Sequence, residues 1–202
     1  DDTNVSRETQ ERLDLYVRLL RKWSPRINLV SRSTLADVWQ RHVLDSAQLM
    51  PLLPERTETV ADLGSGAGFP GLVLAILALE QETPFHVSLV ESDQRKATFL
   101  REVIRETGAS ARVVVQRAET LDLMVDVVTA RAFAGLNKLL EMAHPLVKDD
   151  GIVLLHKGAR YKSELTDAAK DWHMEVEQHT SRIDPASVIL HISGLTRRQE
   201  KS

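Results

Sequence analysis

The chain has 202 residues, of which 43% are hydrophobic and 27% charged, with a formal net charge of -3 and no cysteine. These values are ordinary for a single-domain globular protein, and they exclude disulfides and thiolate metal sites. No apolar run approaches the roughly 20 residues of a membrane helix and no secretory signal opens the chain, so we expect a cytoplasmic protein with no membrane partner. The small negative charge gives no global attraction for nucleic acid, so any such site must be a local patch.

The first quarter of the chain predicts three helices. Ser6 or Thr9 can cap a helix that continues to about Trp23, because apolar residues recur at helical spacing until Ser24-Pro25 ends the pattern. Two short helices are predicted over 35–39 and 41–49. We expect residues 1–55 to form a helical appendage that packs on the rest of the chain, since it is too small to fold alone.

From residue 59 onward, apolar strands alternate with helices. The predicted strands are 59–63, 86–90, 112–115, 125–130, 152–156, 174–179 and 187–193, and the predicted helices are 72–79, 93–107, 136–143 and 162–172. Alternation of this kind indicates an α/β fold with a mostly parallel sheet. The last two strands have no helix between them, which predicts an antiparallel hairpin. We expect this core over residues 56–195 and a basic tail over 196–202.

The stretch from Val60 to Leu74, VADLGSGAGFPGLVL, joins the first strand of this core to its first helix. Its glycines allow positive φ angles and close approach of a ligand, and the helix start offers free N–H groups. Two patterns overlap here. G-x-G-x-x-G over 66–71, with Glu91 lying 20 residues beyond Gly71, fits a dinucleotide fingerprint. D-x-G-x-G-x-G over 62–68 resembles the first motif of S-adenosylmethionine (SAM) methyltransferases. A glycine-rich turn without a ligand is the third possibility.

Candidate site residues lie where predicted parallel strands end, because ligands bind at that edge of such sheets. They are the glycine loop, Glu91, the Ala118-Glu119 pair and Arg131. An acidic residue after the second strand can accept hydrogen bonds from a ribose diol under either reading of the loop. The simpler alternatives are ion pairs, of Glu119 with Arg117 and of Arg131 with Glu119 or Asp126.

Seven stretches of the sequence stand out together: INLVS (27–31), RHVLDS (41–46), DLGSGAGFPG (62–71), ESDQRKATFL (91–100), RAE (117–119), TARAFA (129–134) and GIVLLHKG (151–158). This set resembles the ribosomal RNA small subunit methyltransferase G family, over about residues 15–194. The resemblance implies a Rossmann-like class I SAM-dependent methyltransferase with a seven-stranded sheet. It also implies transfer of a methyl group from SAM to N7 of a guanine in 16S rRNA.

The resemblance assigns roles by position. The residues expected to bind the cofactor are Asp62, Gly64, Gly66, Gly68, Phe69, Glu91, Ala118, Glu119 and Arg131. The expected catalytic residues are Arg131, His42 and Asp45, of which the last two can also form a structural hydrogen bond across one helical turn. The family pattern places Asn28, Lys96 and Lys157 near the RNA.

A local basic patch is the second expected RNA contact. The N-terminal segment is basic although the chain is not, and Arg21, Lys22, Arg26 and Arg32 are expected to meet phosphates. The simpler interpretation of these cations is a solvated helix face. We expect 16S rRNA or the small ribosomal subunit as the partner, a monomeric protein and no metal.

Guanine N7 carries an in-plane lone pair and no proton, so its attack on a methyl group requires no general base. The enzyme has to exclude water, align the reacting atoms and hold the base. Arg131 can donate to guanine O6. Two rival functions remain open: an NAD(P)-dependent oxidoreductase, for which 202 residues leave no substrate domain, and a SAM-binding module without turnover.

Overall fold

The computed structural model describes residues 5–198, apart from the side chain of Arg32. These residues form one seven-stranded sheet of order β3-β2-β1-β4-β5-β7-β6. The strands are β1 Thr59–Leu63, β2 His86–Val90, β3 Ala111–Val114, β4 Val125–Arg131, β5 Val147–Lys157, β6 Trp172–Thr180 and β7 Val188–Arg197. Strands β1 to β5 pair in parallel, whereas β7 pairs antiparallel with both β5 and β6. The predicted parallel sheet and its closing hairpin are therefore confirmed.

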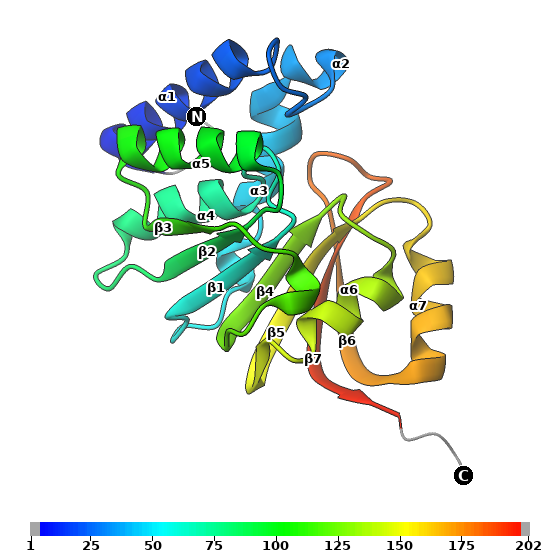
Figure 1. Cartoon of the computed structure of the whole chain (residues 1–202). Coiled ribbons are helices and arrows are strands. Elements are labelled where there is room, and N and C mark those ends of the chain that lie inside the picture. The colour runs from blue at the N-terminus through cyan, green and yellow to red at the C-terminus, as the bar shows by residue number, and fades with distance from the viewer. Residues whose placement is uncertain (1–4, 199–202) are drawn as a thin grey trace.

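Helices cover both faces of this sheet, as Figure 1 shows. Helices α1 (Arg7–Trp23), α4 (Gly71–Leu77) and α5 (Gln94–Thr107) lie on one face, and α6 (Leu136–Ala143) and α7 (Tyr161–Asp171) lie on the other. Residues alternate along β1 because strand side chains point to opposite faces. Val60 packs with α1, α4 and α5, whereas Ala61 and Leu63 pack with α6 and α7.

The N-terminal helices are part of the larger of these two apolar layers. Leu13, Tyr16 and Leu20 of α1 are fully buried in the same cluster as sheet residues. Ser6 caps α1, with its hydroxyl accepting from the Thr9 N–H. The appendage thus packs on the sheet as expected, while its division from the core at residue 55 stays a prediction.

The segment between α1 and β1 differs from the prediction. The second helix, α2, spans Arg32–Leu35 and not 35–39, because the Ser31 hydroxyl caps it by accepting from the Thr34 N–H. The third predicted helix is a π-helix, Trp39–Leu44, followed by the short α3, Asp45–Ala47, and a 3₁₀ turn, Met50–Leu52. The spacing of apolar residues predicts a helix but does not distinguish a π-helix from an α-helix. Single π-helical turns often occur at functional sites.

Further elements are displaced by a few residues. Helix α4 begins at Gly71 and passes into a 3₁₀ turn, Ala78–Glu80. Trp172 begins β6 and does not end α7, and β5 starts five residues earlier than predicted, at Val147. Because β7 continues to Arg197, the first two residues of the predicted tail belong to the sheet, and 199–202 lie outside the described residues.

Candidate active site

The loop after β1 has the backbone shape that only glycine adopts without strain. Gly64, Gly66 and Gly68 have φ angles of +65°, +56° and +98°. A Cβ on Gly68 would lie 2.4 Å from the Leu72 side chain and 2.9 Å from the Tyr16 hydroxyl oxygen. The Tyr16 hydroxyl donates to the Ala67 carbonyl oxygen at 2.6 Å, so α1 stabilises the conformation of the loop. The sequence indicated Tyr16 only as part of an apolar stripe.

Asp62 supports the loop from beneath the sheet edge. Its fully buried carboxylate accepts from the Thr129 hydroxyl at 2.9 Å and from the Gly71 N–H at 3.3 Å. Burial raises the pKa of Asp62 to about 6, although hydrogen bonds from the side chains of Ser65 and Thr129 oppose this shift. Asp62 and Gly68 do not line the cavity described below, so the structure gives them a supporting position and no direct contact with a ligand there.

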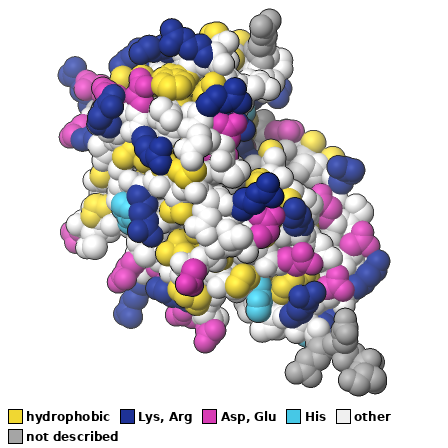
Figure 2. Space-filling model, viewed as in Figure 1, with side chains coloured by type: hydrophobic (Ala, Val, Ile, Leu, Met, Phe, Trp, Pro, Cys, Tyr) yellow, Lys and Arg dark blue, Asp and Glu magenta, His cyan; other side chains and the backbone are white. Residues whose placement is uncertain are grey.

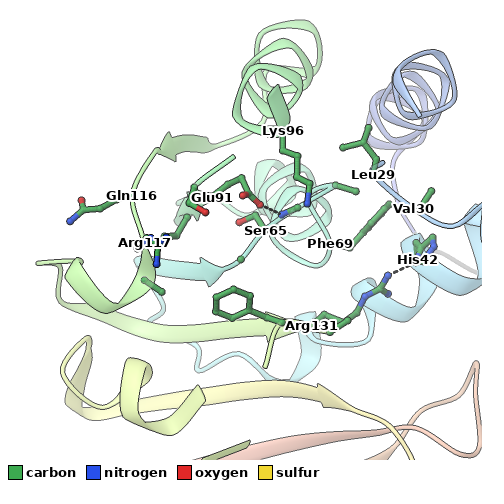
Figure 3. A pocket seen from close by; sticks show the side chains of 18 of the residues that line it. Leu29, Val30, His42, Ser65, Phe69, Glu91, Lys96, Gln116, Arg117 and Arg131 are labelled. Atoms are coloured by element: carbon green, nitrogen blue, oxygen red, sulfur yellow. Dashed lines mark hydrogen bonds between the residues drawn. The ribbon is translucent and has the colours of Figure 1, made fainter. Parts of the chain in front are cut away.

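A cavity of about 630 Å³ opens over the carboxyl ends of β1, β2 and β4, a size typical of small-molecule sites. We call it the first cavity; Figure 3 shows the side chains around it. The remaining predicted cofactor residues all line it: Gly64, Gly66, Phe69, Glu91, Ala118, Glu119 and Arg131. Leu29, Val30 and Lys96 close its other side. The first two belong to the INLVS stretch but were not predicted as site residues.

Glu91 is fixed at the floor of the first cavity. Its two carboxylate oxygens accept from the Gly66 N–H at 2.9 Å and from the Asp93 N–H at 2.8 Å, and its side chain is buried. Each carboxylate oxygen can accept a further hydrogen bond, for example from a ribose hydroxyl. Gly66 leaves open space where its Cβ would stand, with only the Gly64 carbonyl oxygen nearby at 3.7 Å. The residues present thus fit a nucleoside cofactor that lies against the loop.

Arg131, at the end of β4, joins the sheet to the preceding π-helix. Its guanidinium lies 3.2 Å from the Asp45 carboxylate, donates to the Arg41 carbonyl oxygen at 3.2 Å and contacts His42 Nδ1. Figure 3 shows this contact with His42 as a dashed line. The alternative ion pairs of Arg131 with Glu119 or Asp126 are therefore wrong, as is a direct His42–Asp45 hydrogen bond.

Glu119 and Asp126, the two carboxylates considered as ion-pair partners of Arg131, pair with other cations. Asp126 pairs with Lys148 at 2.6 Å, and Glu119 pairs with Lys138 at 3.4 Å and not with Arg117. Arg131 is consequently held toward the N-terminal segment and away from the β3 end of the cavity.

His42 is neutral in this environment. Its ring stacks on Phe69 with centroids 4.9 Å apart and planes inclined by 22°. Burial, together with the adjacent Arg131 charge, lowers the pKa of His42 to about 4. Since Nδ1 faces the guanidinium, a proton has no favourable place on that nitrogen.

Asp45 is the centre of a hydrogen-bond network that the sequence did not reveal. One carboxylate oxygen accepts from Gln48 and from the Ser181 hydroxyl, each at 3.0 Å, and the other faces Arg131. His156 Nε2 lies 3.0 Å from the Asp45 carbonyl oxygen. Ser181 follows β6, so residues 136 positions apart in the sequence fix one carboxylate.

A second cavity, of about 820 Å³, lies beside the first. Thr34, His42, Arg131 and Ala132 line both cavities, and we call these four residues the dividing wall. Ala132 has a φ of +49°, an uncommon conformation for a residue with a Cβ. The backbone after β4 thus turns sharply where the two cavities meet.

The predicted RNA residues fall into three groups. Arg21, Lys22, Arg26 and Asn28 are exposed, and the side chain of Arg32 lies outside the described part. Lys96 lines the first cavity. Lys157 lines the second cavity, but it is buried, lies 2.5 Å from the Glu164 carboxylate and donates to the Ala134 carbonyl oxygen. Its contact with RNA stays a prediction.

Among the described residues, no group of three or more His, Cys, Asp or Glu side chains is arranged to hold a metal ion. Within residues 5–198, no helix is both long enough and apolar enough to cross a membrane.

Solved structures with similar folds include a SAM-dependent methyltransferase and a protein in complex with SAM. A SAM-dependent methyltransferase from Aquifex aeolicus superposes with a TM-score of 0.60 at 14% identity, covering 87% of this chain and 97% of that chain. TYW2 from M. jannaschii, solved in complex with SAM, superposes with a TM-score of 0.57 at 16% identity, covering 87% of this chain and 80% of that chain. At these identities the likeness shows the fold, which is that of class I SAM-dependent methyltransferases.

Sequence comparison gives the family. The model of the family described as rRNA small subunit methyltransferase G matches residues 9–187. Proteins named ribosomal RNA small subunit methyltransferase G from Rhodospirillum centenum and Ruegeria pomeroyi are 54% and 48% identical to this chain. The two alignments cover 96% of this chain in each case, and 88% and 95% of those proteins. This chain therefore belongs to the rRNA small subunit methyltransferase G family.

Proposed function

We propose that this chain transfers the methyl group of SAM to N7 of a guanine in 16S rRNA, by direct attack of the base without a general base. The chain is a SAM-dependent rRNA methyltransferase by its family, which makes the oxidoreductase reading of the glycine loop wrong. The position methylated, the choice of 16S rRNA and the absence of acid–base catalysis are the proposed parts.

The dividing wall is the observation that carries this proposal. The first cavity would hold SAM, with the glycine loop at its methionine end, Glu91 at its ribose and Ala118-Glu119 beside its adenine. When bound, SAM supplies a methyl group on a positively charged sulfur. The second cavity shares four lining residues with the first and is large enough for a nucleobase, so a base in it would lie next to the cofactor site.

The residues of the wall are suited to holding a base and not to moving a proton. Contacts with Asp45, the Arg41 carbonyl oxygen and His42 fix the Arg131 guanidinium. Its remaining N–H groups suit the O6 acceptor beside guanine N7. His42 has a lowered pKa and its Nδ1 faces Arg131, so it is a poor base for a substrate proton. Guanine N7 has no proton to remove, and alignment with exclusion of water is sufficient chemistry.

Incubation of the enzyme with methyl-labelled SAM and deproteinised 16S rRNA tests the proposal. Digestion and mass spectrometry should find 7-methylguanosine at one position, and this mark should be missing from 16S rRNA of cells without the enzyme. Methylation of another atom, or of 23S rRNA alone, would contradict the proposed substrate while leaving the SAM site intact.

A further inference from the structure

We propose that Lys96 binds the α-carboxylate of the SAM methionine group and does not contact RNA. This inference rests on the first cavity as the SAM site. Lys96 is the third residue of α5, and its side chain lines the first cavity. Figure 3 shows it extending from α5 toward the glycine loop, between Glu91 and Phe69.

The order of the strands places the methionine end of the cofactor near Lys96. Along this edge of the sheet the strands follow one another as β3, β2, β1 and β4. Ala118-Glu119, the pair expected beside the adenine, follows β3, and Glu91, expected at the ribose, follows β2. A ligand whose ribose lies at Glu91 and whose adenine lies toward β3 must extend its methionine toward β1. The loop after β1 is where the Lys96 side chain points.

Charge pairing also singles out Lys96. Of the cations that line the first cavity, Arg131 is paired with Asp45 and Lys138 with Glu119. The ammonium of Lys96 makes no hydrogen bond or salt bridge to any of the described residues, and the side chain is only partly exposed. The nearby Glu91 has both oxygens turned to backbone N–H groups. An unpaired ammonium in a concave site is a ready partner for a ligand carboxylate.

Arg117 is the other cavity cation without a salt bridge among the described residues. It immediately precedes the Ala118–Thr120 turn, at the β3 end of the cavity where the adenine is expected. Its position therefore suits the opposite end of the ligand, and it does not compete with Lys96 for the carboxylate.

Binding measurements with two ligands test this proposal without any turnover. S-adenosylhomocysteine carries the carboxylate, and 5′-(3-aminopropylthio)-5′-deoxyadenosine keeps its ammonium but lacks the carboxylate. We expect Lys96→Gln to weaken S-adenosylhomocysteine binding about tenfold by calorimetry, equivalent to about 1.4 kcal/mol. Binding of the decarboxylated ligand should be unchanged. Arg95→Gln is the matched control, since Arg95 is the neighbouring, exposed cation on α5, paired with Asp93 at 3.3 Å.

The outcomes separate Lys96 from the cofactor assignment itself. Equal losses for both ligands, or no loss for either, would overturn the role of Lys96 while leaving the SAM site in place. If Lys96→Gln weakens the salt dependence of RNA binding and leaves S-adenosylhomocysteine affinity unchanged, Lys96 contacts RNA and not the cofactor. Failure of the wild-type protein to bind S-adenosylhomocysteine would instead contradict the first cavity as the SAM site.

Discussion

Arg131 and Asp45 form an ion pair of 3.2 Å between the end of β4 and the helical segment that precedes β1. Both side chains are largely buried, with 16% and 13% of their surfaces exposed. Removal of one member of such a pair leaves an uncompensated charge, so the pair fixes the guanidinium as long as both residues are present. This contact places a rigid donor in the wall between the two cavities.

Arg131→Ala should slow methyl transfer by about 1–3 kcal/mol of transition-state stabilisation, the range of a good contact to a base. Single-turnover rates at saturating SAM and RNA measure this loss. RNA affinity should change much less, because phosphate contacts dominate it. An equal loss in RNA affinity and in rate would show that Arg131 contributes to docking and not to alignment.

Gly66→Val should abolish binding of S-adenosylhomocysteine without unfolding the protein. The added side chain would stand in the open space of the first cavity, where the cofactor is expected. Gly194→Val is a matched control, because Gly194 has a similar φ of +59° and no atom within 4 Å of the site of its Cβ. Both variants carry a similar backbone strain, but only the first should lose ligand binding by calorimetry. If a folded Gly66→Val protein keeps its affinity for S-adenosylhomocysteine, the glycine loop is not part of the cofactor site.

Local patterns predicted most of the fold. The boundaries of β1, β2 and α6 match the prediction because apolar runs, glycines and caps specify them within a few residues. The cavity-facing part of the glycine loop and Glu91 were predicted for the same reason, since one short stretch sets both spacing and conformation. The π-helix was missed because its hydrogen-bond pattern leaves no distinct apolar period.

Long-range contacts were beyond the sequence pattern. Asp45 is fixed by Arg131, His156 and Ser181, which lie 86, 111 and 136 positions away. No local spacing connects these residues, and only the sheet brings them together. The sequence likewise did not predict that Lys157 is buried, because its ion-pair partner Glu164 belongs to a separate helix, α7.

Charge reversal at Arg21, Lys22 and Arg26 together should weaken rRNA binding and flatten its dependence on salt, because fewer counterions are released. These side chains are exposed, and Lys22 makes only a distant pair of 3.8 Å with Glu102. Figure 2 shows Lys and Arg side chains over the region of α1 and α5, interspersed with carboxylates. Lys170→Glu, on α7 across the sheet, is the control for a change of surface charge. If the salt dependence of rRNA binding is unchanged in the triple variant, these three cations are solvated and do not contact the RNA.

Asp62→Asn should remove a pH dependence from stability. The folded-state pKa of Asp62 is raised to about 6, so its protonated form favours folding and this contribution is lost as pH rises. The window runs from about pH 4, the usual aspartate value, to about pH 6. Relative to wild type, the variant should gain up to about 3 kcal/mol of unfolding free energy across this window and stay level above it. A constant difference in urea unfolding from pH 4 to pH 7 would contradict this.

The pH dependence of methyl transfer separates positioning from acid–base catalysis. His is the side chain whose ordinary pKa lies nearest neutrality, but burial and Arg131 lower the pKa of His42 to about 4. His42 therefore stays neutral from about pH 5.5 upward, and the single-turnover rate of the wild type should show no titration near pH 7 that belongs to it.

His42→Ala tests the same point by removal. The variant should be slower, because it loses the stacking of the imidazole on Phe69 and a contact of Arg131, which loosens the dividing wall. Its pH profile should nevertheless run parallel to that of the wild type, since positioning does not depend on a proton at this residue. His42→Phe, which keeps an aromatic ring for stacking, should recover part of the rate. A limb near neutral pH in the wild type that vanishes in both variants would reveal a general base, and the direct attack of N7 would then be wrong.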